Sequence, residues 1–229
     1  MATGTILARE IERLEQRFLL LGGRVEGNLR RAIDSVRNRD RELARRVIAS
    51  DEEIDEFEVE LEEECLKVLA LHQPVASDLR LIVAILKINN DLERVGDLAA
   101  NIAGHTLFLA DRPMIGFPFE FDRMAAETQQ MLRKSLDSIV NQSAAIAQEV
   151  RVADDLVDDL HKQTYTAVEQ LIRDRPELIE SAINFIGLSR RLERVADLAT
   201  NIAEDVIYLV EGEIVRHGVD PGAGDGGEP

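Results

Sequence analysis

One twelve-residue phrase is written twice in this chain, and no other feature constrains the fold as strongly. LERVGDLAANIA covers residues 92–103 and LERVADLATNIA covers residues 192–203, with ten identical positions. A helix turns by about 100° per residue, so Leu92, Val95 and Ala99 share one face while Glu93 and Asp97 lie on the other side. The repetition therefore predicts a duplicated, amphipathic helical unit of roughly 100 residues.

The duplication extends beyond the phrase, because proline interrupts the chain at matching places. Pro74 lies 19 residues before Glu93, and Pro176 lies 17 residues before Glu193. Proline ends a helix because it lacks an N–H donor and restricts the residue before it. Between these breaks, apolar residues recur every three or four positions, which is the spacing of helices that share a core. Each half is therefore predicted to contain three helices, with short connections that make neighbours antiparallel.

The predicted fold class is all-α: two three-helix bundles, six helices in total, related by pseudo-twofold symmetry. The expected helices cover about 7–37, 41–72, 75–110, 121–141, 143–173 and 177–217, and the segment DRPMIGFPF at 111–119 links the halves. The chain is thus divided into a first repeat at 1–113, a second repeat at 114–217 and an acidic Gly/Pro tail at 218–229, which we predict to be disordered.

Composition narrows the range of partners. The formal charge is −17, and this opposes nucleic acid and anionic membranes, both of which are bound through Lys and Arg. The longest apolar run, LIVAIL at 81–86, is far shorter than the ~20 residues of a membrane span. The single cysteine, Cys65, is predicted to be a buried thiol. We expect a soluble cytoplasmic protein without a membrane span or a nucleic-acid partner.

The repeated phrase carries a polar stripe on the side of the helix away from the core. In the first copy the stripe consists of Glu93, Asp97 and Asn101, and in the second of Glu193, Asp197 and Asn201. Acids four residues apart repel each other by a few tenths of a kcal/mol unless something lies between them. A solvated helix face explains a single such stripe, but it explains less easily why both acids and the Asn occur in both copies.

The preceding helix of each repeat supplies a matching acid pair, Asp51 and Asp55 in the first repeat and Asp154 and Asp158 in the second. Antiparallel packing could bring each pair beside the neighbouring stripe, although the sequence does not fix that register. Four carboxylates and an amide oxygen form a hard-oxygen site of the kind preferred by Mg²⁺, Mn²⁺ and Fe, with Zn²⁺ as a further candidate. At this density the carboxylates could bridge several ions.

The doubled phrase at the end of two three-helix repeats resembles the paired motifs of the PhoU family. The family's acid-xxx-Asp pattern is matched closely by Glu93/Asp97 and Glu193/Asp197, and more loosely by the two pairs on the preceding helices. The resemblance covers about residues 5–217. It implies iron, zinc or manganese, singly or in multinuclear clusters, on the bundle surface. It implies no catalytic reaction.

The resemblance also implies partners and a role. PhoU-like proteins are cytoplasmic and frequently dimeric regulators, which link the ATPase of a phosphate ABC transporter to a sensor histidine kinase. They hold the phosphate-starvation response off when phosphate is ample. The two copies differ around the motif, since residues 89–91 read NND and residues 189–191 read SRR, so the two metal sites need not be equivalent.

Two rival functions stay open on sequence grounds. A ferritin-like di-iron enzyme needs Glu-x-x-His on two helices, but none of the four histidines has Glu three residues before it, and only Asp158 precedes a histidine, His161, at that spacing. A metal-free helical scaffold is the second rival. Direct phosphate binding has no support in the sequence, because no Gly-rich phosphate loop occurs and the acidic surface opposes an anion unless a metal bridges it.

Two smaller expectations concern residues near the stripes. His105 is predicted to be either a fifth ligand at the end of the first stripe or an exposed surface residue. Arg94 and Arg194 follow the motif glutamates, and we expect them to pair with the aspartates three residues later, Asp97 and Asp197, or to contact a partner protein.

Overall fold

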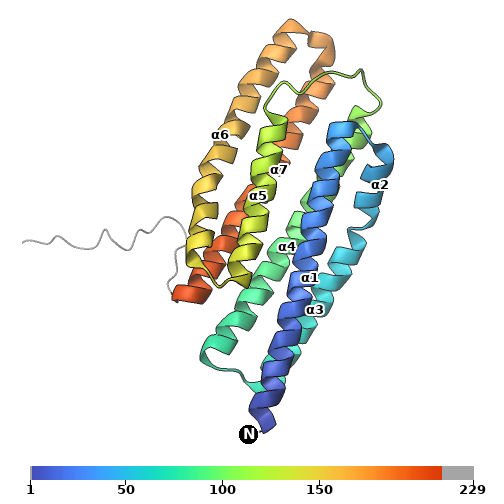
Figure 1. The fold of residues 1–229 in the computed structure, drawn as a ribbon. Coiled ribbons are helices and arrows are strands. Elements are labelled where there is room, and N and C mark those ends of the chain that lie inside the picture. The colour runs from blue at the N-terminus through green and yellow to red at the C-terminus, as the bar shows by residue number, and fades with distance from the viewer. Residues whose placement is uncertain (1, 213–229) are drawn as a thin grey trace, which may run out of the picture.

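The computed structural model describes residues 2–212, and every regular element in that range is helical (Figure 1). The elements are α1 (Ala2–Asn38), α2 (Arg41–Ala49), α3 (Glu52–His72), α4 (Ala76–Leu109), α5 (Phe121–Val140), α6 (Ala144–Asp174), the 3₁₀ turn η1 (Pro176–Leu178) and α7 (Ile179–Glu211). The all-α prediction is confirmed. No helix among the described residues is long and apolar enough to cross a membrane.

Local signals in the sequence set the helix ends. Asp40 precedes α2 and its side chain accepts a hydrogen bond from the amide of Leu43, at 2.9 Å, while Ser143 caps α6 in the same way through Ile146. These side chains satisfy amides that the first helical turn leaves without partners. At the end of α3, Gln73 adopts a left-handed conformation with φ of 45° directly before Pro74, so the chain turns sharply into α4.

The second predicted helix is two helices in the structure, with a break at Ser50 and Asp51. The Ser50 hydroxyl donates to Val47 O and to Asn28 Oδ1 on α1, at 2.9 Å each. Side chains that bond to nearby backbone in this way compete with helical pairing, and no proline or glycine marks this place in the sequence. The break leaves Asp51 at the start of α3, where its side chain makes no capping bond.

The last predicted helix begins as the 3₁₀ turn η1 and continues as α7, which ends at Glu211. Gly212 follows with φ of 75°, a left-handed conformation that commonly terminates helices. The predicted continuation to residue 217 and the predicted disordered tail at 218–229 lie outside the described residues.

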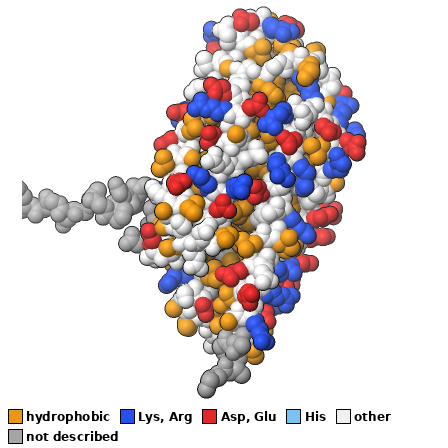
Figure 2. All heavy atoms as spheres, in the orientation of Figure 1, with side chains coloured by type: hydrophobic (Ala, Val, Ile, Leu, Met, Phe, Trp, Pro, Cys, Tyr) orange, Lys and Arg blue, Asp and Glu red, His pale blue; other side chains and the backbone are white. Residues whose placement is uncertain are grey.

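The helices form an elongated bundle in which α4 and α7 lie side by side and antiparallel, with α1 and α5 packed in front of them (Figure 1). One continuous apolar core extends through both repeats. Cys65 is part of this core and is fully buried, as predicted, and burial raises the pKa of its thiol to about 12. On the face shown in Figure 2, basic and acidic side chains are interspersed with apolar ones.

The two ends of the α4–α7 contact are held by different chemistry. At one end, Lys87 Nζ on α4 lies 3.3 Å from Asp205 Oδ1 on α7. At the other end, His105 on α4 lies against Gly187 on α7, where a Cβ on the glycine would approach the imidazole Cε1 to 2.9 Å. His105 is therefore neither an exposed surface residue nor a member of the acidic stripe, and both expectations for it are wrong.

Candidate metal centres between α3 and α4 and between α6 and α7

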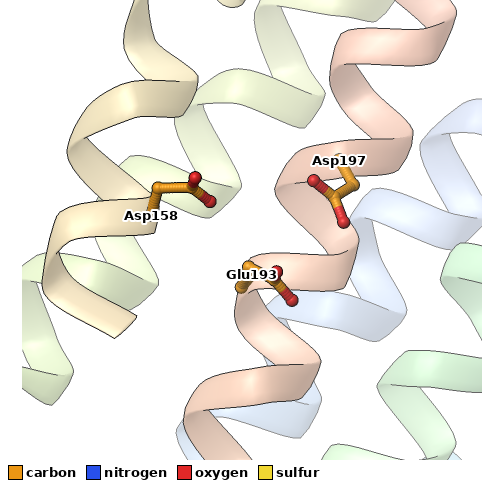
Figure 3. Close-up of side chains that lie close together, drawn as sticks. All are labelled: Asp158, Glu193 and Asp197. Atoms are coloured by element: carbon orange, nitrogen blue, oxygen red, sulfur yellow. The ribbon is translucent and has the colours of Figure 1, made fainter. Parts of the chain in front are cut away.

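The second repeat brings three predicted ligands together across two helices. Asp158 projects from α6, and Glu193 and Asp197 project from successive turns of α7 (Figure 3). One carboxylate oxygen of each residue lies within 4.8 Å of the others. The buried neighbours Val157 and Leu192 fix the two helix faces, so the acids beside them converge at the edge of the core. We refer to these three acids and Asp154 as the second cluster.

Burial and neighbouring carboxylates raise the pKa values of Asp154, Glu193 and Asp197 in the second cluster. Burial, followed by the charges of Asp197 and Asp158, raises the pKa of Asp154 to about 6. Burial and the same two aspartates also raise the pKa of Glu193, and burial together with Asp158 raises that of Asp197. Partial burial and mutual repulsion both disfavour the charged forms. A bound cation would instead favour the charged forms of these carboxylates.

The first repeat assembles the corresponding acids between α3 and α4. Burial and the charges of Asp55 and Asp97 raise the pKa of Asp51 to about 6, and burial with the neighbouring acids, led by Asp97, raises the pKa of Glu93. The packing register that the sequence left open thus places α3 beside the α4 stripe. We refer to Asp51, Asp55, Glu93 and Asp97 as the first cluster.

The Asp51 side chain shows how closely the first cluster approaches its helix. A Cβ built on Gly96 would lie 3.2 Å from Asp51 Oδ1 and 3.1 Å from Ile54 Cγ2. The same oxygen is buried and has no hydrogen-bond partner among the described protein atoms. A buried carboxylate oxygen without a donor is costly and calls for an explanation such as an ion. In the second repeat, the position equivalent to Gly96 is occupied by Ala196.

The donor set fits a hard divalent or ferric cation. The second cluster takes two acids from α6 and two from α7, and the first takes two from α4, Asp55 from α3 and Asp51 from the position directly before α3. Oxygen donors in this number suit Mg²⁺, Mn²⁺ and iron. The orphaned Asp51 oxygen in the first cluster and the convergence of three carboxylates in the second give structural support to the fit.

The two predicted asparagine ligands lie on the exposed faces of α4 and α7, as Asp97 and Asp197 do. Asn101 is exposed, and its Nδ2 donates to the backbone carbonyl of Asp97 at 2.7 Å. Asn201 is exposed as well. Arg94 also differs from expectation, because it pairs with Asp91 at 3.4 Å rather than with Asp97. The predicted pairing of Arg194 with Asp197 is not formed either, since no ion pair of Arg194 occurs among the described residues.

One acidic residue beside the first cluster escaped the sequence reasoning. Glu58 lies one turn beyond Asp55, its pKa is raised by burial and by Glu62 and Asp55, and it contributes in turn to the raised pKa of Glu93. Asn89 on α4 donates to its Oε1 at 3.0 Å and to its backbone oxygen at 2.9 Å. The spacing Asp51, Asp55, Glu58 along one helix face could have revealed it.

The equivalent pair in the second repeat is His161 and Ser189. His161 follows Asp158 by three residues, as Glu58 follows Asp55, and Ser189 occupies the position of Asn89. His161 Nδ1 lies 2.5 Å from Ser189 Oγ, and the ring packs edge-on against Tyr165. Burial lowers the pKa of this imidazole. The histidine of the Asp-x-x-His spacing therefore makes a hydrogen bond between α6 and α7.

Comparisons with known proteins agree with this architecture. The model of the PhoU domain matches the chain twice, at residues 18–106 and 121–206. The phosphate-specific transport system accessory protein PhoU homolog of Aquifex aeolicus is 36% identical over 211 residues, which cover 92% of this chain and 96% of the relative. The Escherichia coli protein PhoU is 31% identical over 91% of this chain and 86% of its own length.

Solved structures show the same fold. The crystal structure of PhoU from Pseudomonas aeruginosa aligns with a TM-score of 0.86 at 35% identity, covering 90% of this chain and 99% of that chain. The crystal structure of the phosphate transport system regulatory protein PhoU from Streptococcus pneumoniae aligns with a TM-score of 0.85 at 30% identity. The alignment covers 92% of this chain and 100% of that chain. With two domain matches, close relatives and the same helical architecture, the chain belongs to the PhoU family.

Proposed function

We propose that this protein is an accessory regulator of phosphate transport that acts by binding cations and partner proteins rather than by catalysis. Its relatives are named as accessory or regulatory proteins of phosphate transport systems. The observation that carries the cation-binding part is the convergence of Asp158, Glu193 and Asp197 from two helices.

The eight acids of the two clusters would hold the cations. A bound metal would supply positive charge to carboxylates whose charged forms are disfavoured by burial and by their neighbours, as the raised pKa values of Asp51, Asp154 and Glu193 indicate. Neutralisation would tie α3 to α4 and α6 to α7, because each cluster spans two helices. The chain's own contribution is to present these oxygens on rigid helices before an ion arrives.

The partner-binding part of the proposal follows from the family. The protein would contact the ATPase of a phosphate ABC transporter and a sensor histidine kinase, and it would restrain the phosphate-starvation response when phosphate is ample. The formal charge of −17 favours partner surfaces that carry basic patches. Self-association into a homodimer belongs to the same proposal and is measured by analytical ultracentrifugation.

Metal content tests the cation sites directly. We expect purified protein to contain metal by mass spectrometry, and Glu93→Ala with Asp97→Ala, or Glu193→Ala with Asp197→Ala, to remove the ions of one cluster each. Unchanged metal content in both double variants would contradict the assignment. A wild-type protein that contains no metal and shows no thermal shift with Mn²⁺, Fe²⁺ or Zn²⁺ would instead favour a metal-free scaffold.

The chain offers a matched control for these experiments. Asp155 and Asp159 lie on α6 one position beyond Asp154 and Asp158, with the same spacing, and both are exposed. Replacing Asp155 and Asp159 by alanine removes the same charge from the same helix and should leave the metal content unchanged. Co-purification with the transporter ATPase or the kinase, in phosphate-replete cells, tests the partner part, and repeated failure to recover either protein would contradict it.

A further inference from the structure

Helix α3 carries a larger excess of acids than any other helix that the structure describes. It contains nine acids and one lysine, whereas its counterpart α6 contains seven acids and three basic residues. Helix α3 packs against α1 and α4, and its opposite side faces outward from the bundle (Figure 1). This outward side is exposed along the length of the helix and is open to a partner protein.

The cations near α3 pair with acids at one flank or within the helix. Arg17 of α1 lies 2.6 Å from Glu60 and 3.2 Å from Glu64. The lysine of α3, Lys67, lies 3.4 Å from Glu63. These pairs involve three of the nine acids of α3, so the helix keeps a large uncompensated negative charge. Such a surface favours a partner that supplies positive charge.

Two aliphatic side chains lie on the outward side of α3, between acids. Val59 and Leu66 are 52% and 51% exposed. A helix turns by about 100° per residue, so the two side chains lie within about 20° of each other, and Val59 lies about 160° from the buried Leu61. Glu56 and Glu62 are exposed, form no ion pair within residues 2–212, and lie about 60° to either side of Val59. We refer to Val59 and Leu66 as the α3 ridge.

The second repeat shows that the fold does not require the α3 ridge. In the alignment that pairs the acidic clusters, Val59 corresponds to Lys162 and Leu66 corresponds to Glu169 on α6, and both of these residues are exposed. Lys162 lies 3.4 Å from Asp159 in its own helix. Isolated exposed aliphatic residues are common on protein surfaces, but here the same positions are charged in the other copy. The aliphatic pair is therefore specific to the first repeat and is not a requirement of the helical architecture.

We propose that the α3 ridge and the acids beside it bind an amphipathic helix of a partner protein, with Lys and Arg on both sides of its apolar seam. The inference deepens the partner-binding part of the proposed function and rests on it. Aliphatic residues seven positions apart meet one face of a facing helix. The unpaired acids on both sides select positive charge at the rim of the contact. The same acids repel nucleic acid and anionic membranes.

The α3 helix of a second copy does not fit this description. Two helices with nine acids and one lysine each would place like charges opposite one another, which disfavours the contact. Self-association of the protein through another surface leaves the α3 ridge open to its partner.

The test exchanges the ridge for the residues that α6 has at the same positions, Val59→Lys with Leu66→Glu. The net charge does not change, so this ridge variant loses only the apolar contact. The probe is a fluorescent synthetic peptide of about five helical turns, with leucine at every third or fourth position and lysine elsewhere. Binding is followed by fluorescence anisotropy with Mn²⁺ present, so that the peptide gains no affinity by occupying a metal-free first cluster. We expect the ridge variant to bind about tenfold more weakly than the wild type, because two half-exposed aliphatic side chains are no longer covered.

Val152→Lys with Ile183→Glu is the matched control. These aliphatic side chains on α6 and α7 are 67% and 60% exposed, and their exchange also keeps the net charge, so peptide binding should not change. Glu56→Gln with Glu62→Gln should weaken binding and reduce its dependence on salt, because two charges are lost from the rim. A peptide with glutamate in place of lysine should not bind. Circular dichroism verifies that each variant keeps its helices.

Absence of binding of the lysine peptide by the wild type, equal binding by the ridge variant, or an equal loss in the control variant would overturn the inference. Self-association that is lost in the ridge variant, measured by analytical ultracentrifugation, would assign the ridge to a second copy and overturn the choice of partner. Co-purification separates these results from the proposed function. Recovery of the transporter ATPase or the kinase equally with the wild type and the ridge variant would refute docking on α3 alone. Failure to recover either protein with the wild type would be a failure of the proposed function, and the peptide measurement would still decide for α3.

Discussion

Lys87 and Asp205 join the two repeats through an ion pair, with Lys87 Nζ 3.3 Å from Asp205 Oδ1 and the Asp205 side chain only 5% exposed. The lysine also lies over the ring of Tyr208, with Nζ 5.5 Å from the centroid. Lys87→Met removes the cation from a buried carboxylate, and such losses are strongly destabilising when both partners are buried. The lysine itself is partly exposed, so we expect a loss of about 1–3 kcal/mol in urea unfolding. Lys67→Met, which breaks an exposed pair with Glu63 on one helix, should cost less than about 0.5 kcal/mol.

The close approach of His105 to Gly187 gives a second prediction. Gly187→Ala would place a methyl group 2.9 Å from the imidazole Cε1, so the ring or the helices must move, and we expect a loss of about 1–3 kcal/mol. Adding His105→Ala to Gly187→Ala should recover part of the lost stability. The free-energy changes of the two substitutions, measured by thermal unfolding, should therefore not be additive. Gly104→Ala meets no atom within 4 Å and should instead stabilise α4 by up to about 1 kcal/mol. Strictly additive effects would show that the contact is not formed.

The acidic clusters predict an unusual pH dependence for metal-free protein. The pKa values of Asp51 and Asp154 are raised from 3.8 to about 6, so the folded state holds their protons more tightly than the unfolded state. Their contribution to stability is therefore complete below about pH 4 and is lost as the pH rises to about 6. Both side chains are partly exposed, so solvent screening limits the effect to about 1 kcal/mol each.

Asp51→Asn with Asp154→Asn should remove this part of the pH dependence and make metal-free protein more stable at pH 7. The same variant should lose the stabilisation that Mn²⁺ gives to the wild type, which denaturant titrations at pH 4.5 and pH 7 would reveal. Equal stability of the wild type and the variant across that range would show that the two carboxylates do not titrate as described.

Gly96 supplies a prediction that separates the two clusters. Gly96→Ala would crowd Asp51 Oδ1 at 3.2 Å and Ile54 at 3.1 Å, so we expect the first cluster to bind metal about tenfold more weakly, which corresponds to about 1.4 kcal/mol. The second cluster already has alanine at this position, Ala196, and should be unaffected. Metal titration of Gly96→Ala in the Glu193→Ala/Asp197→Ala background isolates the first site, and an unchanged affinity there would contradict the steric argument.

The helices and the helix faces that carry the clustered acids followed from the sequence because their signals are local. Apolar periodicity, proline breaks and the repeated acids are read along one helix at a time, and they located Glu93, Asp97 and their copies correctly on the α4 and α7 surfaces. The break before Asp51 was missed, because it depends on a bond from Ser50 to Asn28 on another helix. The surroundings of His105 were predicted wrongly for the same reason, because they depend on the contact between α4 and α7 and not on the sequence of α4 alone.

The two ends of the α4–α7 contact occupy equivalent positions in the repeats, since Lys87 aligns with Gly187 and His105 aligns with Asp205. If two first repeats were paired in this way, Lys87 would meet His105 at both ends. If two second repeats were paired, Asp205 would be buried against Gly187 without its lysine. Each half of the chain is thus built to recognise the other half and to disfavour its own copy, so the divergence of the duplicated units favours the pairing of unlike halves over the pairing of two identical halves.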